Sequence, residues 1–213
     1  MIFRAERGMT VLPLDTMFPS LQPVEIDIGC GKGGFLLARA QAHPEVNLIG
    51  IERMLKRVRK VDGKLLRSGL SNVRLLREEC MHAVSTMFPS ASVQTAYLFF
   101  SDPWPKRRHH RRRLVSEPFV DALSSALKSG GHVHVMTDHL EYFEMIRGMF
   151  SKHLSYIPVA FPDFPMEERT DFERVFEKEK KPIGRCSFRR SDRSLDVLPV
   201  APPGTATSQP NQS

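Results

Sequence analysis

A strand, a glycine-rich turn and a helix follow one another in residues 24–42, and this order constrains the fold more than any other stretch of the chain. Residues 24–28 have the pattern of a strand, and residues 29–34 read GCGKGG. An apolar helical pattern then runs from about residue 35 to residue 42, where His43-Pro44 ends it. A glycine-rich turn in this position is typical of α/β units that bind a nucleotide-like ligand, because glycine lets the backbone approach the ligand closely.

Strand and helix patterns alternate along the rest of the chain. Apolar runs of strand length predict further strands at residues 46–51, 73–76, 96–100 and 132–136. Helical spacing predicts helices at residues 54–68, 81–88, 116–129, 140–150 and 170–181. Two more strands are predicted at residues 156–161 and 184–189, the latter as an antiparallel edge. We therefore expect an α/β fold with a mostly parallel sheet and helices on both faces.

The length of 213 residues is sufficient for one well-packed domain. We assign residues 1–23 to a lead-in, residues 24–190 to the domain and residues 191–213 to a disordered tail. The tail is rich in Pro, Ser, Thr and Gln, a composition that cannot bury a core. Because no apolar run has membrane-spanning length and the first residues lack a signal-peptide pattern, we expect a soluble cytoplasmic protein.

The cysteines and histidines do not predict a metal site. The three cysteines, Cys30, Cys80 and Cys186, are far apart and form no CxxC pair, so we expect reduced thiols. His132 and His134 share one face of a predicted strand, but no further ligand stands at metal spacing. We therefore expect no bound metal.

Carboxylates stand at the ends of the predicted parallel strands. Asp27 lies just before the glycine turn and Glu52 ends the second strand. The acids that follow the later strands are Glu78, Glu79, Asp102 and Asp138. Because the carboxyl ends of parallel strands meet at one edge of the sheet, where ligands bind in open α/β folds, we expect these acids to surround one ligand site.

The glycine turn predicts a cofactor that contains a nucleoside. Gly29, Gly31 and Gly34 match G-x-G-x-x-G, and Glu52 stands where an acid that binds ribose hydroxyls is expected. A dinucleotide fits this pattern, but Asp27 would repel its pyrophosphate. S-adenosylmethionine fits better, because carboxylates attract its amino group and sulfonium cation. Two alternatives remain open: an NAD-dependent oxidoreductase, and a non-catalytic nucleic-acid-binding module on a nucleotide-binding fold.

A basic segment follows the fourth predicted strand. Ser101-Asp102-Pro103-Trp104-Pro105 closes that strand, and residues 106–113, which we call the basic arm, read KRRHHRRR. The arm has six cationic side chains and no acid, whereas the net charge of the whole chain is +7. The basicity is therefore local, which favours a surface that binds a polyanion. A solvated loop and a localisation signal are the alternatives.

A second group of cations lies in the helix predicted at residues 54–68. Lys56, Arg57, Arg59 and Lys60 form its polar side. A solvated surface is the ordinary interpretation of such a pattern. That interpretation changes only if the fold brings these residues beside the basic arm.

The chain resembles the bacterial tRNA (guanine-N7)-methyltransferases over about residues 24–189. The most specific part of the resemblance is FSDPWPKRRH at residues 100–109, with the arginines after it. The glycine turn, Gly50-Ile51-Glu52, Lys128-Ser129-Gly130-Gly131 and Thr170-Asp171-Phe172-Glu173 support it. The resemblance implies a Rossmann-like methyltransferase sheet, S-adenosylmethionine as methyl donor, and a guanosine of the tRNA variable loop, usually position 46, as acceptor.

The resemblance also implies roles for individual residues, with Asp102 as the catalytic one. The cofactor-binding residues that it implies are Asp27, Gly29, Gly31, Gly33, Glu52, Glu79 and Asp102. The substrate-binding residues are Lys106, Asp138, Thr170, Asp171, Phe172 and Glu173. The RNA-binding residues are Arg108, His109, His110, Arg111, Arg112 and Arg113.

Three positions depart from the family's pattern. Asp27 stands where Glu is common, Glu79-Cys80 where an Asp-Ala pair is common, and Asp171 where a basic or neutral residue is usual. Glu78 therefore competes with Glu79 for the cofactor site. The oligomeric state stays open between a monomer and a homodimer.

Overall fold

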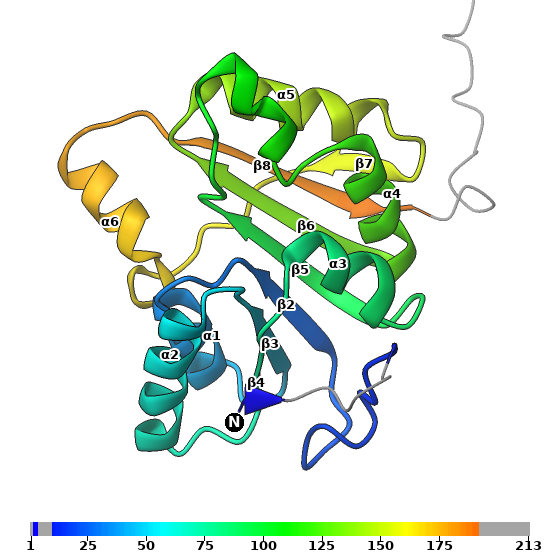
Figure 1. Ribbon diagram of the computed structural model, residues 1–213, viewed down its shortest axis with the longest axis vertical. Helices are drawn as coiled ribbons and strands as arrows, with labels where there is room; N and C mark the ends of the chain where they lie inside the picture. Colours follow the sequence, from blue (N-terminus) through cyan, green and yellow to red (C-terminus); the bar gives the residue numbers. More distant parts are fainter. Residues whose placement is uncertain (1, 4–9, 192–213) are drawn as a thin grey trace, which may run out of the picture.

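The computed structural model describes residues 2–3 and 10–191, and one sheet runs through the molecule (Figure 1). Its eight strands lie in the order β1-β4-β3-β2-β5-β6-β8-β7. The strands are β1 Ile2–Phe3, β2 Val24–Ile28, β3 Asn47–Ile51, β4 Val73–Leu76, β5 Val93–Phe99, β6 Leu127–Thr137, β7 Tyr156–Val159 and β8 Gly184–Arg190. Strand β8 runs antiparallel to β6 and β7, and every other neighbouring pair is parallel. The predicted mostly parallel α/β fold is confirmed.

Helices cover both faces of this sheet (Figure 1). The α-helices are α1 Gly34–Ala42, α2 Leu55–Ser68, α3 Cys80–His82, α4 Glu117–Ala126, α5 Leu140–Lys152 and α6 Asp171–Lys178. A π-helical turn, η1 Ala83–Met87, continues α3, and two 3₁₀ turns are η2 Arg107–Arg112 and η3 Met166–Glu168. None of the described helices is long and apolar enough to cross a membrane.

Three hydrophobic clusters pack around the sheet, and the smallest joins Phe35 of α1 to Tyr97 and Phe99 of β5. On one face, Leu36 of α1 packs in a cluster with Val58, Val61 and Leu65 of α2. On the other face, the larger cluster joins strand residues such as Ile26 to α3, α4 and α5. Both faces of the central strands are thus buried, which explains why these strands read as apolar runs with little alternation.

The sequence predicted that Gly130 and Gly131 end a helix, and this prediction is wrong. Helix α4 ends at Ala126, and β6 starts at Leu127 and continues through both glycines. Gly130 has φ +74°, and the pairing of β5 with β6 shifts register nearby. A Cβ on Gly131 would lie 2.9 Å from the carbonyl oxygen of Gln94. The two glycines therefore form an irregularity inside a strand, where a side chain would not fit.

Two further expectations need correction. The strand predicted at residues 184–189 is antiparallel, but β7 lies outside it and forms the edge of the sheet. The lead-in predicted at residues 1–23 contributes to the core where it is described, since Leu12, Met17 and Phe18 are buried. Apart from Ser191, the predicted tail lies outside the described residues.

Gly50 of β3 lies in close packing behind the site, and a larger side chain there should destabilise the fold. A Cβ at this position would lie 2.5 Å from Leu36 Cδ2 and 3.0 Å from Cys30 Sγ. Gly50→Ala should lower the free energy of unfolding by about 1–3 kcal/mol, as overpacking does. Gly148→Ala in α5 is the control, because its Cβ would meet no atom within 4 Å. It should raise stability by about 0.4–1 kcal/mol. Denaturant unfolding measures both, and equal changes would contradict this account of the core.

Candidate active site at the carboxyl ends of the strands

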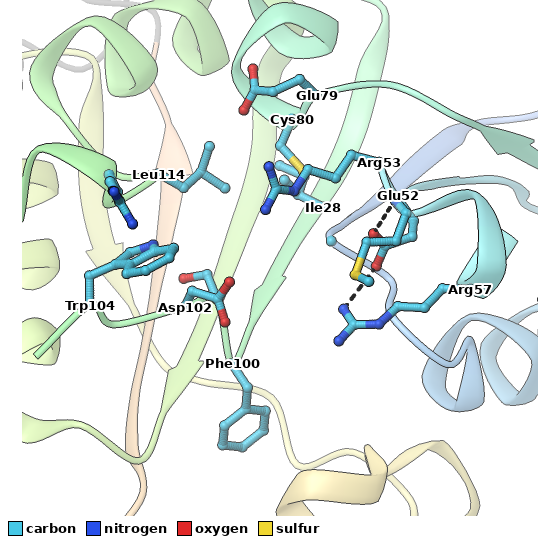
Figure 2. Close-up of a pocket in the computed structure, with 14 residues that line it drawn as sticks. Ile28, Glu52, Arg53, Arg57, Glu79, Cys80, Phe100, Asp102, Trp104 and Leu114 are labelled. Atoms are coloured by element: carbon cyan, nitrogen blue, oxygen red, sulfur yellow. Dashed lines mark hydrogen bonds and ion pairs between the residues drawn. The ribbon is translucent and has the colours of Figure 1, made fainter. Parts of the chain in front are cut away.

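A cavity of about 420 Å³ lies at the carboxyl ends of β2, β3 and β5. Figure 2 shows its lining, which comes from the ends of these strands, the start of α2, the start of α3 and the turn after β5. The lining residues are Ile28, Gly29, Glu52, Arg53, Met54, Arg57, Glu79, Cys80, Phe100, Ser101, Asp102, Trp104, Arg112 and Leu114. The volume is within the range of about 300–1,000 Å³ that is usual for small-molecule sites.

Glu52 lines the cavity, whereas Asp27, one of the predicted cofactor residues, is buried behind the lining beside Ile28. Asp27 is 4% exposed and lies one residue before the end of β2. Glu52 is 5% exposed and directly follows β3, which pairs with β2. Burial, together with the charge of Glu52, raises the pKa of Asp27 to about 7. Glu52 accepts hydrogen bonds from the backbone N–H of Met54 at 2.8 Å and from Arg57 at 3.3 Å. Arg57 thus partly offsets Glu52, and the charge of Glu52 acts in turn on the buried Asp27.

Glu79 is the acid after β4 that faces the cavity. It lines the cavity, and its carboxylate accepts a hydrogen bond from the N–H of His82 at 2.9 Å, which caps α3. Glu78 instead accepts a bond from the N–H of Glu79 at 2.8 Å. Burial and then the charges of Glu79, Glu52 and Asp27 raise the pKa of the Cys80 thiol to about 12, so this cysteine stays protonated. The charges of Glu79, Glu52 and Asp27 thus all act on the Cys80 thiol.

The glycine turn brings only its first glycine to the cavity. Gly29 lines the cavity, whereas Gly31 and Gly33 shape the turn behind it. All three have positive φ angles, of 82°, 54° and 69°. A Cβ on Gly33 would lie 2.6 Å from Val61 of α2. Glycine is therefore required at Gly33 for both the backbone conformation and the packing of α2.

The turn after β5 forms the opposite wall of the cavity. Phe100 and Trp104 both adopt positive φ angles, 53° and 43°, which are uncommon for aromatic residues. Asp102 lies between them and is exposed at the cavity wall (Figure 2). The guanidinium of Arg112 lies 5.0 Å from the ring centroid of Trp104. A carboxylate, an aromatic face and a cation thus meet at one place.

The basic arm is folded back on the protein as the 3₁₀ turn η2. Lys106, Arg107, Arg108, Arg111 and Arg112 are exposed along it, and His109 and His110 are half-buried. Arg113 differs, since its side chain is 3% exposed. Its guanidinium donates to both carboxylate oxygens of Glu141 in α5, at 3.0 and 2.6 Å, and to the carbonyl oxygen of Pro103 at 2.8 Å.

Arg113 therefore corrects the prediction that every arginine of the arm faces RNA. Its side chain lies inside the protein and connects the turn at Pro103 to α5. The guanidinium also lies 4.9 Å from the ring centroid of Tyr142. In this arrangement Arg113 positions the turn that carries Asp102 and Trp104, and its charge is not presented to a polyanion.

Comparison with known proteins identifies the family. Residues 21–186 match the protein family described as "Putative methyltransferase". A protein of Streptococcus thermophilus (strain CNRZ 1066) named tRNA (guanine-N(7)-)-methyltransferase is 34% identical over 181 residues, which cover 83% of this chain and 84% of the relative. A protein of the same name from Leifsonia xyli subsp. xyli is 38% identical over 190 residues, which cover 87% of this chain and 82% of the relative. The chain belongs to the tRNA (guanine-N(7)-)-methyltransferase family. The resemblance found in the sequence is thereby confirmed.

Solved structures support the fold of the family. The 16S rRNA methyltransferase KamB matches with a TM-score of 0.62 at 14% identity, covering 88% of this chain and 98% of KamB. The antibiotic-resistance methyltransferase Kmr matches with a TM-score of 0.57 at 17% identity, covering 84% of this chain and 92% of Kmr. At these identities the likeness shows a methyltransferase fold.

The family's T-x-F-E element lies beside the cavity and does not line it. Thr170 caps α6 by accepting a hydrogen bond from the N–H of Glu173 at 2.9 Å. Phe172 is 56% exposed and packs against Phe100, with ring centroids 5.8 Å apart. Glu173 is buried and pairs with Arg185 at 2.9 Å. Through Phe100, the element contacts the wall of the cavity that the turn after β5 forms.

The remaining predicted substrate residues lie outside the cavity, near the carboxyl-end edge of the sheet. Asp171 approaches the start of α1, where its Oδ1 lies 3.2 Å from the position that a Cβ on Gly34 would occupy. Asp138 and Lys106 are exposed at the end of β6 and at the start of the arm. These three residues do not line the described cavity.

Several lining residues were missed by the sequence argument. Arg53 and Arg57 enter the cavity from the start of α2, and Phe100 and Leu114 close it from the turn. The available signal was that Arg53 directly follows Glu52 and that Arg57 stands four residues later, but a solvated helix gives the same pattern. Their position follows from the close packing of α2 against the glycine turn.

The described histidines do not form a metal site. His134 lies 2.7 Å from the Ser187 hydroxyl, and burial lowers its pKa to about 3. Its ring stacks on His132, with centroids 5.9 Å apart. Within the described residues no group of histidine, cysteine or acidic side chains is arranged to hold a metal ion.

Asp27→Asn should remove a pH dependence of stability. The pKa of Asp27 is about 7 in the folded protein against an ordinary 3.8, so the folded state binds more protons between these values. The stability that Asp27 contributes is fully present below its ordinary pKa of 3.8 and is lost as the pH rises through its folded-state pKa of about 7. The variant should lack this loss, and its stability between about pH 4 and pH 8 should fall less than that of the wild type, by on the order of 1–4 kcal/mol. Denaturant unfolding across this range measures the difference, and parallel pH profiles would contradict it.

Arg113→Ala should destabilise the protein, whereas Arg111→Ala on the same arm should not. Arg113 loses charged hydrogen bonds and buried packing, so we expect a loss of about 1–3 kcal/mol. Arg111 is exposed, so its truncation should change stability by less than about 0.5 kcal/mol. Denaturant unfolding of the two variants compares them directly. Equal stabilities would show that Arg113 does not hold the turn.

Proposed function

We propose that the protein transfers a methyl group from S-adenosylmethionine to N7 of a guanosine in tRNA and so forms 7-methylguanosine. The observation that carries this proposal is a single cavity with Glu52 and Glu79 on one side and Asp102, Trp104 and the basic arm on the other (Figure 2). The names of the relatives support the reaction and the tRNA. By the family resemblance, the acceptor is the variable-loop guanosine at position 46.

The chemistry of the carboxylates fits this cofactor. A neighbour of the same fold from Streptococcus mutans was solved with SAH, the demethylated product, and this supports the choice. Burial, and then the charge of Glu52, raises the pKa of Asp27, and a nearby bound cation would lower it again. When bound, S-adenosylmethionine supplies an electrophilic methyl group on a sulfonium sulfur.

Individual side chains divide the binding of the cofactor. Glu52 accepts hydrogen bonds from the ribose hydroxyls, and Gly29 lets the backbone come close. Glu79 and Asp27 offset positive charge, Asp27 from its buried position. Gly31 and Gly33 hold the turn in shape, as their positive φ angles require.

The acceptor makes few chemical demands on the protein. Guanine N7 carries an in-plane lone pair and no proton, so its methylation needs no general base. The protein has to hold N7 in line with the methyl carbon and exclude water. Asp102 accepts hydrogen bonds from N1–H and N2–H2 of guanine and offsets the positive charge that the ring gains. Trp104 offers a stacking face for a base, backed by Arg112.

The outer residues complete the binding of tRNA. We propose Arg108, His109, His110, Arg111 and Arg112 as contacts to RNA, largely through phosphates. We propose Lys106, Asp138 and the element of Thr170, Asp171, Phe172 and Glu173 as contacts near the target nucleotide. Phe172 is the best placed of these, because it already packs against Phe100 at the cavity wall.

The experiment that tests the function uses methyl-labelled S-adenosylmethionine and bulk unmodified tRNA. Labelled tRNA should be cleaved by chemistry specific for 7-methylguanosine, at one position in the variable loop. Label at a different base atom would correct the reaction, and absence of label would contradict the proposal. NAD in place of S-adenosylmethionine should show no binding.

Asp102→Ala should lower turnover far more than stability or cofactor affinity. An orienting carboxylate acts on the bound guanine, so kcat should fall by about 10²-fold. Asp102→Asn, which retains one acceptor but no charge, should fall between this variant and the wild type. Asp163→Ala is the matched control, because that carboxylate is exposed and lies away from the cavity. Single-turnover methylation measures all three variants, and near-normal turnover of Asp102→Ala would make Asp102 a turn residue only.

A further inference from the structure

We infer that one side of α2 is a second phosphate-binding surface, which faces the basic arm across the cavity. This surface, which we call the α2 strip, consists of Arg53, Arg57, Lys60 and Lys64. Its ligand is the sugar-phosphate backbone of the tRNA on the side of the target guanosine that the basic arm does not reach. The inference rests on the proposed function and adds a contact surface to it.

The spacing places Arg57, Lys60 and Lys64 on one side of α2. They stand at intervals of three and four residues, which brings them into line along the helix axis, and Arg53 lies just before the helix and lines the cavity with Arg57. The buried side of α2, formed by Val58, Val61 and Leu65, points elsewhere. Arg59 is exposed as well, but its position in the helical repeat puts it on the other flank of the exposed surface.

The two ends of the strip show where it runs. At one end, Arg53 and Arg57 line the cavity, and Figure 2 shows both across the cavity from Asp102 and Trp104. At the other end, the Nζ of Lys64 donates to the carbonyl oxygen of Lys32 in the glycine turn at 2.9 Å. The strip therefore starts at the site and continues along the turn beside it.

The distribution of charge sets α2 apart from an ordinary solvated helix. Its residues 55–68 include six cations and one acid, Asp62. The net charge of the chain is +7, and the arm has six cations, so the rest of the protein outside the arm and α2 is net negative. Solvated helices usually mix charges of both signs at i, i+4 spacing. Positive charge is thus concentrated in two places, and both border one cavity.

The cations of the strip are available to a ligand. Lys60 is exposed, and the hydrogen bond of Lys64 goes to a backbone carbonyl oxygen, that of Lys32. Arg57 pairs with Glu52 at 3.3 Å, but its side chain is still 52% exposed. Lys60 and the exposed part of Arg57 can therefore reach a phosphate, although Arg57 also pairs with the buried Glu52.

The geometry of an RNA chain offers phosphates to two such surfaces. A guanosine inside a chain carries a phosphate on its 5′ side and another on its 3′ side, so the backbone has to leave the cavity in two directions. The arm lies on the side of Trp104, and the strip lies on the side of Glu52. Cations on both sides hold the backbone in place over the cavity and carry no sequence information.

The test compares Lys60→Glu with Arg59→Glu, two charge reversals at adjacent exposed positions of the same helix. Neither residue lines the cavity. Affinity for unmodified tRNA is measured at several salt concentrations. Lys60→Glu should weaken binding by about 5–20-fold near 0.1 M salt and make the slope of log affinity against log salt shallower by about one. Arg59→Glu should change affinity less than about 2-fold.

Two further measurements keep the result clear. Affinity for S-adenosylmethionine and the thermal midpoint should be unchanged in both variants, which excludes a folding defect. If the wild type binds tRNA but transfers no methyl group, the proposed function fails and the strip can still be judged from the salt slopes. If the wild type methylates tRNA and the slopes of the two variants coincide, the strip is not an RNA surface. A change in oligomeric state by Lys60→Glu without a change in slope would make it a contact between copies and overturn the inference.

Discussion

Two buried carboxylates at the ends of neighbouring strands constrain the rest of this site. Asp27 and Glu52 lie in a place with little water, and burial together with the charge of Glu52 raises the pKa of Asp27 to about 7. Buried acids of this kind are costly unless a cation or hydrogen-bond donors offset them. The fold provides only partial relief, through the N–H of Met54 and the guanidinium of Arg57. A cationic ligand would offset part of the remaining cost, and this is the physical basis of the cofactor that we propose.

The second wall of the cavity depends on a different ion pair. Arg113 connects Pro103 to Glu141, so the turn that carries Asp102 and Trp104 is attached to α5. Arg113 is buried, whereas the other cationic side chains of the arm are exposed. The arm therefore includes a structural residue, Arg113, and exposed cations that we propose bind RNA. Opposite to it, α2 brings a second row of cations to the same cavity.

The sequence predicted the order of strands and helices, because apolar runs and glycine turns are local signals. It also predicted that acids from different strand ends share one site, and Glu52, Glu79 and Asp102 line one cavity, whereas Asp27 is buried behind the lining. It did not predict the break in β6 at Gly130, since a pair of glycines ends a helix as readily as it forms an irregular strand. Nor did it predict that Arg113 is buried or that Arg53 and Arg57 enter the cavity. Those positions depend on the packing of α5 and α2, which are distant in sequence from the residues that they meet.

The central claim is that the acids at the strand ends select a cofactor without a phosphate and with a positive charge. Calorimetric titration of the free protein with S-adenosylmethionine, with its demethylated product and with NAD tests this claim directly. S-adenosylmethionine should bind, and because its cation lowers the pKa of Asp27, binding near pH 7 should release protons that buffers of different ionisation enthalpy detect. The neutral-sulfur product should bind as well, with a smaller release of protons, and NAD should not bind. Binding of NAD in the absence of any binding of S-adenosylmethionine would contradict the account.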